Sequence, residues 1–255
     1  MPRLALACEY DGTDFVGWQA QASGRTVQAV LSDAIEAVAA ESVSVHGAGR
    51  TDTGVHAENQ IAHFDTEASR TSRQWLLGIN SNLPADVSLR WIQTVPANFD
   101  ARRSALWREY RYTISNQATR PARERRFVWW LRDHLDCGAM TAAASAWLGE
   151  RDFSAFRAAH CQSTTPMRRM LRIQVSEAPS RIEMRFRANA FLYHMVRNLV
   201  GALVAIGRGD APVGWARELI AGRDRRKGAA TAPAQGLALS SIAYAKEFGL
   251  PGAEA

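Results

Sequence analysis

Residues 47–57 bring together the groups that could do chemistry. This stretch contains three glycines, Gly47, Gly49 and Gly54, together with Arg50 and Asp52. Glycines at this density indicate a backbone that turns sharply or lets a ligand approach closely. An Arg-Thr-Asp triplet in such a turn offers a cation and a carboxylate at a fixed separation. We therefore expect Asp52 to be the reactive group and the rest of the chain to position it.

The triplet Asp-Thr-Gly at 52–54 is also the signature of an aspartic protease. Protease chemistry of that kind requires two facing carboxylates, and the chain has no second Asp-Thr-Gly or Asp-Ser-Gly. The triplet also follows Arg50 and Thr51 and not an apolar strand. The sequence therefore disfavours a protease.

Other familiar catalytic patterns are missing from the sequence. The glycine spacing matches neither a dinucleotide fingerprint nor a phosphate loop. His46, His56 and His63 lack zinc-ligand spacing, and each is expected to be structural or hydrogen-bonded locally. No Gly-x-Ser-x-Gly elbow occurs, and Cys161 beside His160 has no nucleophile signature. We expect no metal site and no cofactor.

The charge of the chain is carried by arginine. The 255 residues have a net charge of +6, and Lys227 and Lys246 are the only lysines. Guanidinium groups match phosphate oxygens and stack on bases, so a polyanionic partner such as a nucleic acid is expected. Clusters of arginine in predicted loops support backbone-phosphate contacts, and they lie at 102–103, 120–126, 168–169 and 223–227.

The cysteines and the apolar segments indicate a cellular compartment. Cys8, Cys137 and Cys161 are odd in number and far apart, which is typical of reduced thiols and not of a disulfide framework. The longest apolar stretch, 190–207, carries His194 and Arg197 and is too short to span a membrane. With no signal peptide recognisable, we expect a cytoplasmic protein without a membrane partner.

The first half of the chain reads strand, helix, strand, strand, helix, strand, the ferredoxin-like order. Alternation predicts the strands and a 3.6-residue period predicts the helices. Thr26 can cap the first helix. The expected elements are strands at 3–10, 42–46, 60–66 and 87–95 and helices at 27–38 and 72–80.

The second half repeats this order with additions. Its expected elements are strands at 105–115, 170–177, 180–188 and 237–244 and helices at 138–148, 191–206 and 213–221. We therefore predict an α+β protein made of two tandem ferredoxin-like (βαββαβ) halves with antiparallel sheets. The predicted halves are 1–100, which carries the catalytic loop, and 101–255, whose last residues, 251–255, are expected to fray.

Seven segments in order resemble motifs of the tRNA pseudouridine synthase A family. The stretch 49–57 resembles the family's catalytic motif, and 10–19 resembles its first-strand motif. The resemblance covers nearly the whole chain, and its further segments are 26–28, 108–112, 152–156, 189–198 and 234–237. Family members commonly have alanine in place of Thr53 and often a larger residue in place of Ala238. Neither departure removes a charged or nucleophilic group, so we expect altered packing and retained activity.

The resemblance implies the pseudouridine synthase fold and isomerisation of uridine to pseudouridine at positions 38, 39 and 40 of the tRNA anticodon stem-loop. It implies that Asp52 is the catalytic residue, and that the protein is a homodimer with each tRNA contacting both subunits. Residues that match the family's substrate-binding positions are Arg50, Tyr110, His194, Arg197 and Leu237.

Two of these residues also raise expectations of their own. Tyr110 lies mid-strand, where its ring could stack on a flipped base, although Tyr112 points the same way and either could be a core tyrosine. Arg197 lies in a helix that is apolar on nearly every side, and a buried guanidinium requires a carboxylate partner. Asp52 is the partner we predict, which would place the active site in a cleft between the halves.

A tandem RNA-binding protein without catalysis is the main alternative. The predicted sheets lack an RNP-type cluster of aromatic residues, and a negative charge in the tightest loop would repel phosphate. Tritium release from uridine C5 would separate the two interpretations.

Overall fold

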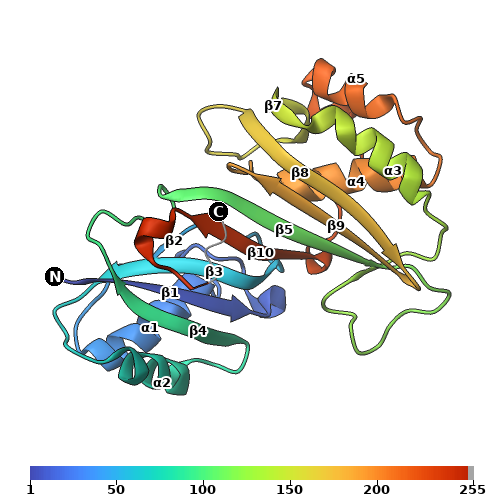
Figure 1. Ribbon diagram of the computed structural model, residues 1–255. Helices are drawn as coiled ribbons and strands as arrows, with labels where there is room; N and C mark the ends of the chain where they lie inside the picture. The colour runs from blue at the N-terminus through green and yellow to red at the C-terminus, as the bar shows by residue number, and fades with distance from the viewer. Residues whose placement is uncertain (252–255) are drawn as a thin grey trace. The chain divides into compact units, whose positions relative to one another are not determined.

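The computed structural model describes residues 1–251, so the expected frayed end falls almost entirely outside the described residues. The chain forms two compact units (Figure 1). The first contains Met1–Arg108 and the chain from Ala238 onward, and the second contains Glu109–Leu237. This division differs from the predicted one at 100/101, because the last strand joins the first unit. There Ala238 pairs with His56 in a parallel arrangement.

The first unit follows the predicted order of elements. β1 (Arg3–Tyr10) is the central strand, with β4 on one side and β3 on the other. In this register Leu6 lies opposite Ala62 of β3 and Ile92 of β4, and both pairings are antiparallel. The remaining elements are α1 (Val27–Ala39), β2 (His46–Gly47), β3 (His56–Asp65), α2 (Ser72–Asn82), β4 (Val87–Val95), β10 (Leu237–Tyr244) and the short 3-10 turns Gly12–Asp14 and Lys246–Phe248.

Local capping explains where the helices of this unit begin. The Thr26 hydroxyl accepts a hydrogen bond from the Ala29 N–H, as predicted. Thr71 and Gln74 form a reciprocal capping box at the start of α2. Both helices lie along the same face of the β1–β3–β4 sheet and pack against each other (Figure 1).

Two strands of the first unit differ from their predicted ranges. The segment expected at 42–46 forms only the two-residue β2, because side chains of α1 bind its backbone. Glu36 accepts from the Val43 N–H at 3.1 Å, and the Gln28 amide donates to the Val45 carbonyl at 2.8 Å. The strand expected at 60–66 begins earlier, at His56. The predicted catalytic motif therefore runs directly into β3.

The second unit has a sheet of order β5-β9-β8-β7, with β6 beside β5. Helices α3 and α4 pack together, and α3 also contacts β8. β8 and β9 form the predicted hairpin, which turns at Ser180 with φ of 63°. The elements are β5 (Ala105–Ser115), β6 (Trp129–Trp130), α3 (Cys137–Ala144), β7 (Gly149–Asp152), β8 (Met167–Ala178), β9 (Arg181–Ala188), α4 (Met195–Gly207), α5 (Trp215–Gly222) and the 3-10 turns Ser145–Trp147, Ser154–Phe156, Arg225–Lys227 and Ala234–Gly236.

Helix α4 begins later than its apolar pattern predicts. The pattern indicates a helix from 191, whereas α4 starts at Met195. His194 adopts a left-handed conformation with φ of 60°, and the Met195 N–H closes a turn onto the Leu192 carbonyl. A turn of this kind cannot continue a right-handed helix. Residues 191–194 therefore form a separate bend ahead of α4.

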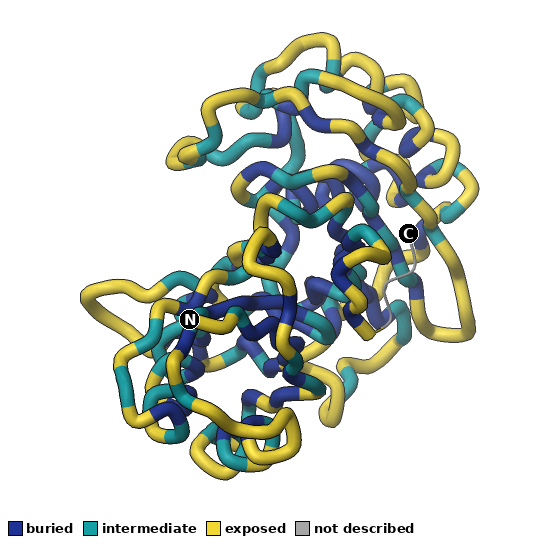
Figure 2. The backbone as a smooth tube through the Cα atoms, turned by 60° about the vertical axis from the view of Figure 1, so that its left-hand side comes forward, coloured by how far each residue is buried: buried dark blue, intermediate teal, exposed yellow. Residues whose placement is uncertain are grey.

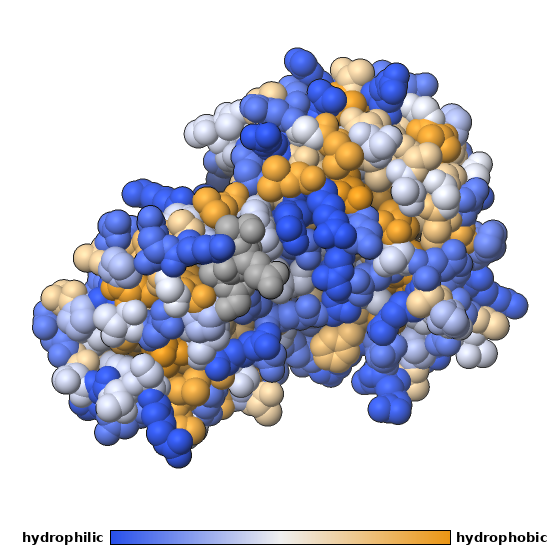
Figure 3. Space-filling view, viewed as in Figure 1, coloured by the Kyte–Doolittle hydropathy of each residue, from blue (hydrophilic) through white to orange (hydrophobic). Residues whose placement is uncertain are grey.

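The α+β class with mainly antiparallel sheets is confirmed. Buried residues concentrate along the strands and on the inner faces of the helices, while many loop residues are exposed (Figure 2). Much of the visible surface is hydrophilic, with smaller apolar areas between the polar side chains (Figure 3). None of the described helices is long and apolar enough to cross a membrane.

Candidate active site

Asp52 lies in the loop between β2 and β3, residues 48–55, which we call the Asp52 loop. Its neighbours alternate in exposure: Arg50 is exposed, Thr51 is buried and Asp52 is half-buried. The Val55 N–H donates to the Asp52 carbonyl at 3.1 Å, and Gly54 between them has φ of 75°. This tight turn supplies the bend that the glycines predict.

The segment 11–18, directly after β1, grips the Asp52 loop along its backbone. The Trp18 N–H donates to the Thr51 carbonyl at 3.0 Å, and the Gly54 N–H donates to the Phe15 carbonyl at 3.3 Å. The Thr53 hydroxyl adds a bond to the Val16 carbonyl at 3.1 Å. Two stretches that are distant in sequence therefore form one hydrogen-bonded structure.

Glycine is required where these two segments meet. A Cβ atom at Gly12 would lie 2.0 Å from the Val55 carbonyl oxygen. Gly17 has φ of 111°, and its Cβ would lie 2.7 Å from the Thr51 carbonyl oxygen. Both distances are shorter than any tolerable contact with backbone atoms. The glycines of 11–18 therefore serve the close approach of the two loops.

Buried polar side chains fix both ends of the Asp52 loop. The Tyr10 and Thr51 hydroxyls are 2.8 Å apart. At the other end, His56 Nδ1 accepts from the Gly12 N–H at 3.0 Å and lies 3.2 Å from the Asp11 carboxylate. His56 thus has the structural role that is the other expectation for it, with a hydrogen-bond partner 44 positions away in the sequence.

Gln60 and Arg108 support the loop from beneath, a role that the sequence motifs do not predict for either residue. The Gln60 amide donates to the Gly49 carbonyl at 2.6 Å. Arg108, which is 9% exposed, donates to the Ala48 carbonyl at 3.0 Å and to the Arg102 carbonyl. The sequence signal that could have pointed to Gln60 is a glutamine within the predicted strand 60–66, because a polar side chain that is buried in a sheet requires a hydrogen-bond partner.

In the second unit, Tyr110 and Tyr112 have different surroundings on the same face of β5. Tyr110 is 8% exposed and its ring meets the Phe191 ring edge-on, with centroids 5.1 Å apart. Tyr112 is fully buried and donates to the Pro233 carbonyl at 2.9 Å. Burial raises the pKa of the Tyr112 hydroxyl, which keeps it protonated. Tyr112 is therefore the core tyrosine of the pair.

The other predicted residues of the second unit cluster around the start of α4 and the segment before β10. The His194 and Tyr193 rings lie 4.0 Å apart. Arg197 is half-buried, whereas the apolar pattern of the helix predicts a buried guanidinium. Its Nε donates to the Ala232 carbonyl at 2.7 Å. Leu237 is buried at the start of β10.

Asn198 is a further buried polar group that organises this region. Its amide donates to the Phe156 carbonyl at 2.8 Å. Its oxygen accepts from Arg225 at 3.0 Å and from the Thr231 hydroxyl at 2.7 Å. Together with Arg197, it anchors the segment 225–236. The predicted pairing of Arg197 with Asp52 stays a prediction, since these residues belong to units that are described separately.

Comparisons with known proteins decide the family. A family model described as tRNA pseudouridine synthase matches residues 6–102 and 143–245. The protein is 48% identical to tRNA pseudouridine synthase A of Legionella pneumophila strain Lens, over 97% of this chain and 95% of the relative. It is 48% identical to the protein of that name from Alcanivorax borkumensis and 46% identical to that from Klebsiella pneumoniae, over 98% of this chain and 94% and 92% of the relatives. The chain belongs to the tRNA pseudouridine synthase family.

Thr53 and Ala238 are the two departures from the pattern of the tRNA pseudouridine synthase family, and the structure shows what each of them contacts. Thr53 uses its hydroxyl to bind the Val16 carbonyl, a contact that an alanine could not make. Ala238 is buried in the β10 pairing with β3, beside His56. Both residues therefore lie in or beside the Asp52 loop, and altered packing there stays a prediction.

His63 and the three cysteines, which the sequence also singles out, have structural surroundings. Burial, reinforced by Arg3, lowers the pKa of His63 to about 4, so that Nδ1 can accept from the Ala101 N–H at 3.1 Å. Burial raises the pKa of the Cys8 thiol to about 12. All three cysteines are free thiols, as predicted. Within residues 1–251 no group of His, Cys, Asp and Glu is arranged to hold a metal ion.

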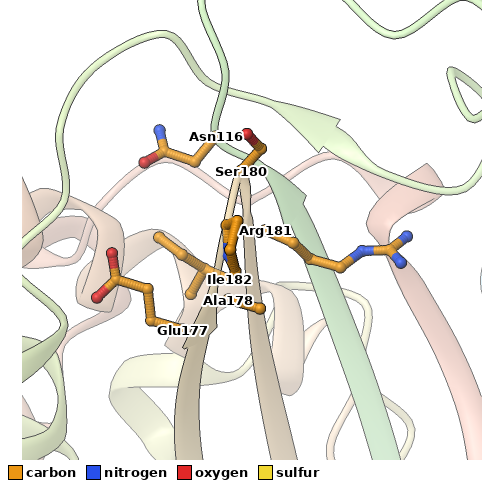
Figure 4. Close-up of a pocket in the computed structure, with 7 residues that line it drawn as sticks. Asn116, Glu177, Ala178, Ser180, Arg181 and Ile182 are labelled. Atoms are coloured by element: carbon orange, nitrogen blue, oxygen red, sulfur yellow. The ribbon is translucent and has the colours of Figure 1, made fainter.

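An open hollow of about 380 Å³ lies at the tip of the β8–β9 hairpin (Figure 4). Glu177 and Arg181 point to opposite sides of it, and the Asn116 N–H donates to the Ser180 carbonyl at 2.9 Å. Its lining is made by Asn116, Glu177, Ala178, Pro179, Ser180, Arg181 and Ile182. None of the predicted site residues contributes to this hollow.

Proposed function

We propose that this protein isomerises uridine to pseudouridine at positions 38, 39 and 40 in the anticodon stem-loop of tRNAs, with Asp52 as the catalytic residue. Membership of the family supports the reaction and the tRNA substrate. The observation that carries the assignment of Asp52 is its loop, a carboxylate on a backbone anchored by the Trp18 and Gly54 N–H groups. A reacting group held in this way is preorganised for catalysis.

The reaction breaks the bond between ribose C1′ and uracil N1 and forms a bond between C1′ and C5. The base turns between these steps, N1 gains a proton and C5 loses one, so that the product is an isomer. No redox equivalent is consumed, and we propose that no cofactor takes part. A carboxylate suits the reaction because it can attack carbon or stabilise positive charge that develops on the sugar. We assign that role to Asp52.

A uridine within a stem must leave the base stack before it can react, at a cost of about a few kcal/mol. Arg50 is exposed two residues before Asp52, and we propose that its guanidinium fills the vacated space and holds a phosphate. Tyr110 presents an aromatic ring to the flipped base. We propose that His194, Arg197 and Leu237 complete substrate binding.

We further propose that the protein is a cytoplasmic homodimer in which each tRNA contacts both subunits. The net charge of +6, carried almost entirely by arginine, supports a long phosphate footprint. Sedimentation of the protein with and without tRNA would test the stoichiometry.

The proposed reaction is tested by tritium release from tRNA labelled at uridine C5, because isomerisation expels that hydrogen to water. Wild-type protein should release tritium, and Asp52→Asn should be slower by about a thousandfold or more, since it removes the reacting charge and keeps the shape. Asp33→Asn, at an exposed position of α1 in the same unit, is the matched control and should remain active. No release by the wild type, or undiminished release by Asp52→Asn, would refute the assignment.

A further inference from the structure

Tyr10 and Thr51 form a buried hydroxyl pair directly behind the Asp52 loop. Their oxygens are 2.8 Å apart, and the residues are only 4% and 6% exposed. Tyr10 is the last residue of β1, which is the central strand of the sheet. The pair therefore ties the loop to a strand that is paired on both sides.

Thr51 is held by its backbone as well as by its side chain. Its carbonyl accepts from the Trp18 N–H at 3.0 Å, while its hydroxyl meets Tyr10. The residues on either side of it, Arg50 and Asp52, are more exposed than Thr51 is. Drawing Thr51 into the core thus turns the side chains of its two neighbours outward.

We propose that Tyr10 is a positioning residue for the reaction: its hydroxyl holds Thr51 in the core and thereby fixes the direction of the Asp52 carboxylate. This inference rests on the proposed function. Misplacing a reacting group by about 1 Å can slow a reaction by about a hundredfold. The effect of losing the Tyr10 hydroxyl should therefore appear mainly in the rate of the chemical step.

The test compares Tyr10→Phe with Tyr244→Phe, each of which removes one buried hydroxyl from the first unit. Tyr244 is 1% exposed and donates to the Ala101 carbonyl at 2.6 Å, an acceptor that is not part of the Asp52 loop. In single-turnover tritium release, Tyr10→Phe should reduce the rate at saturating tRNA by about tenfold or more, with half-saturation unchanged within about twofold. Tyr244→Phe should lower the melting temperature and keep the rate.

Substitutions of Thr51 provide the rescue. Thr51→Ser keeps the hydroxyl and should remain within about threefold of the wild-type rate, whereas Thr51→Val keeps the shape and should be as slow as Tyr10→Phe. The double variant Tyr10→Phe/Thr51→Val should be no slower than either single one, because both remove the same bond.

Three results would overturn the positioning role: a wild-type rate in Tyr10→Phe, equal slowing in Tyr244→Phe, or additive slowing in the double variant. Complete inactivity of the wild type would refute the proposed function itself, and the role of Tyr10 with it. The wild-type arm thus separates the two failures.

Discussion

The Asp52 loop and the segment 225–236 are both irregular connections held in place by polar contacts, but the contacts differ in kind. The Asp52 loop is held largely by backbone groups at very short approach, with Gly12 and Gly17 at the points of contact. The segment 225–236 is held mainly by side chains, among them Arg197 and Asn198, beside a backbone bond from the Ala232 N–H to the Arg197 carbonyl at 3.1 Å. A backbone contact leaves little freedom, whereas a guanidinium fork can adjust to its partner. The region that carries the proposed reacting carboxylate is therefore the more tightly specified one.

The largest effect is expected from adding one methyl group at Gly12, where the segment 11–18 meets the Asp52 loop. In Gly12→Ala the new Cβ would lie 2.0 Å from the Val55 carbonyl oxygen, and neither backbone can yield without loss of its hydrogen bonds. We expect the free energy of unfolding to fall by about 3 kcal/mol and tritium release to fall with it. Urea denaturation measures the first quantity.

Gly222→Ala is the matched control for this substitution. Gly222 ends α5 in the second unit, and nothing lies within 4 Å of the position that a Cβ atom would take there. The control should keep wild-type stability or gain slightly, because alanine favours helix more than glycine does. A stable and active Gly12→Ala would show that the approach of the two loops is not required.

The elements of this fold are largely predictable, because periodicity reports which residues must be buried together. The strand 105–115 is predicted with its observed bounds, and Thr26 is predicted as a helix cap. The pattern cannot reveal that Gln28 and Glu36 bind the backbone of 43–45, since a side chain that competes with strand pairing leaves no periodic signal. Nor can it reveal the left-handed His194, which shortens α4.

The sequence predicts which residue of the candidate site could react, but it does not predict which residues hold the loop in place. Asp52 stands out because a carboxylate between glycines is unusual, and the resemblance to a family assigns it a role. Arg108 stands out only as part of a strand motif, yet its guanidinium holds the Ala48 carbonyl. Contacts of this kind join residues 60 positions apart, and one sequence carries no record of such pairs. The function of a motif is therefore easier to predict than the residues that hold it.

The stability of the protein should depend on pH through His63, a buried and neutral histidine of the first unit. The pKa of His63 is lowered to about 4 from its ordinary value of 6.5, first by burial and then by Arg3, partly offset by Asp100. Because the unfolded chain binds this proton more readily, stability is fully present above pH 6.5 and is lost as the pH falls towards 4. We expect a loss of about 2 kcal/mol across that window.

Urea denaturation at several pH values compares wild type with His63→Gln, which cannot titrate. The variant should be less stable at about pH 7.5 but should show a shallower decline between about pH 6.5 and 4.5. An equally steep decline in both proteins would assign the pH dependence to other groups.

The smallest effect is expected from a substitution beside the segment 225–236. Tyr112→Phe removes the hydroxyl that donates to the Pro233 carbonyl and leaves the ring against Gly236. We expect a loss of about 1 kcal/mol in the free energy of unfolding, the usual contribution of one buried hydrogen bond. Because Arg197 and Asn198 still anchor 225–236, the rate of tritium release at saturating tRNA should stay near that of the wild type.

Tyr10→Phe likewise removes a tyrosine hydroxyl, here the one that holds the Asp52 loop. It should have the opposite effect, changing the rate more than the stability. If Tyr112→Phe slowed the reaction as much as Tyr10→Phe, precise positioning would depend equally on both regions, and the contrast between backbone and side-chain anchoring would lose its functional meaning.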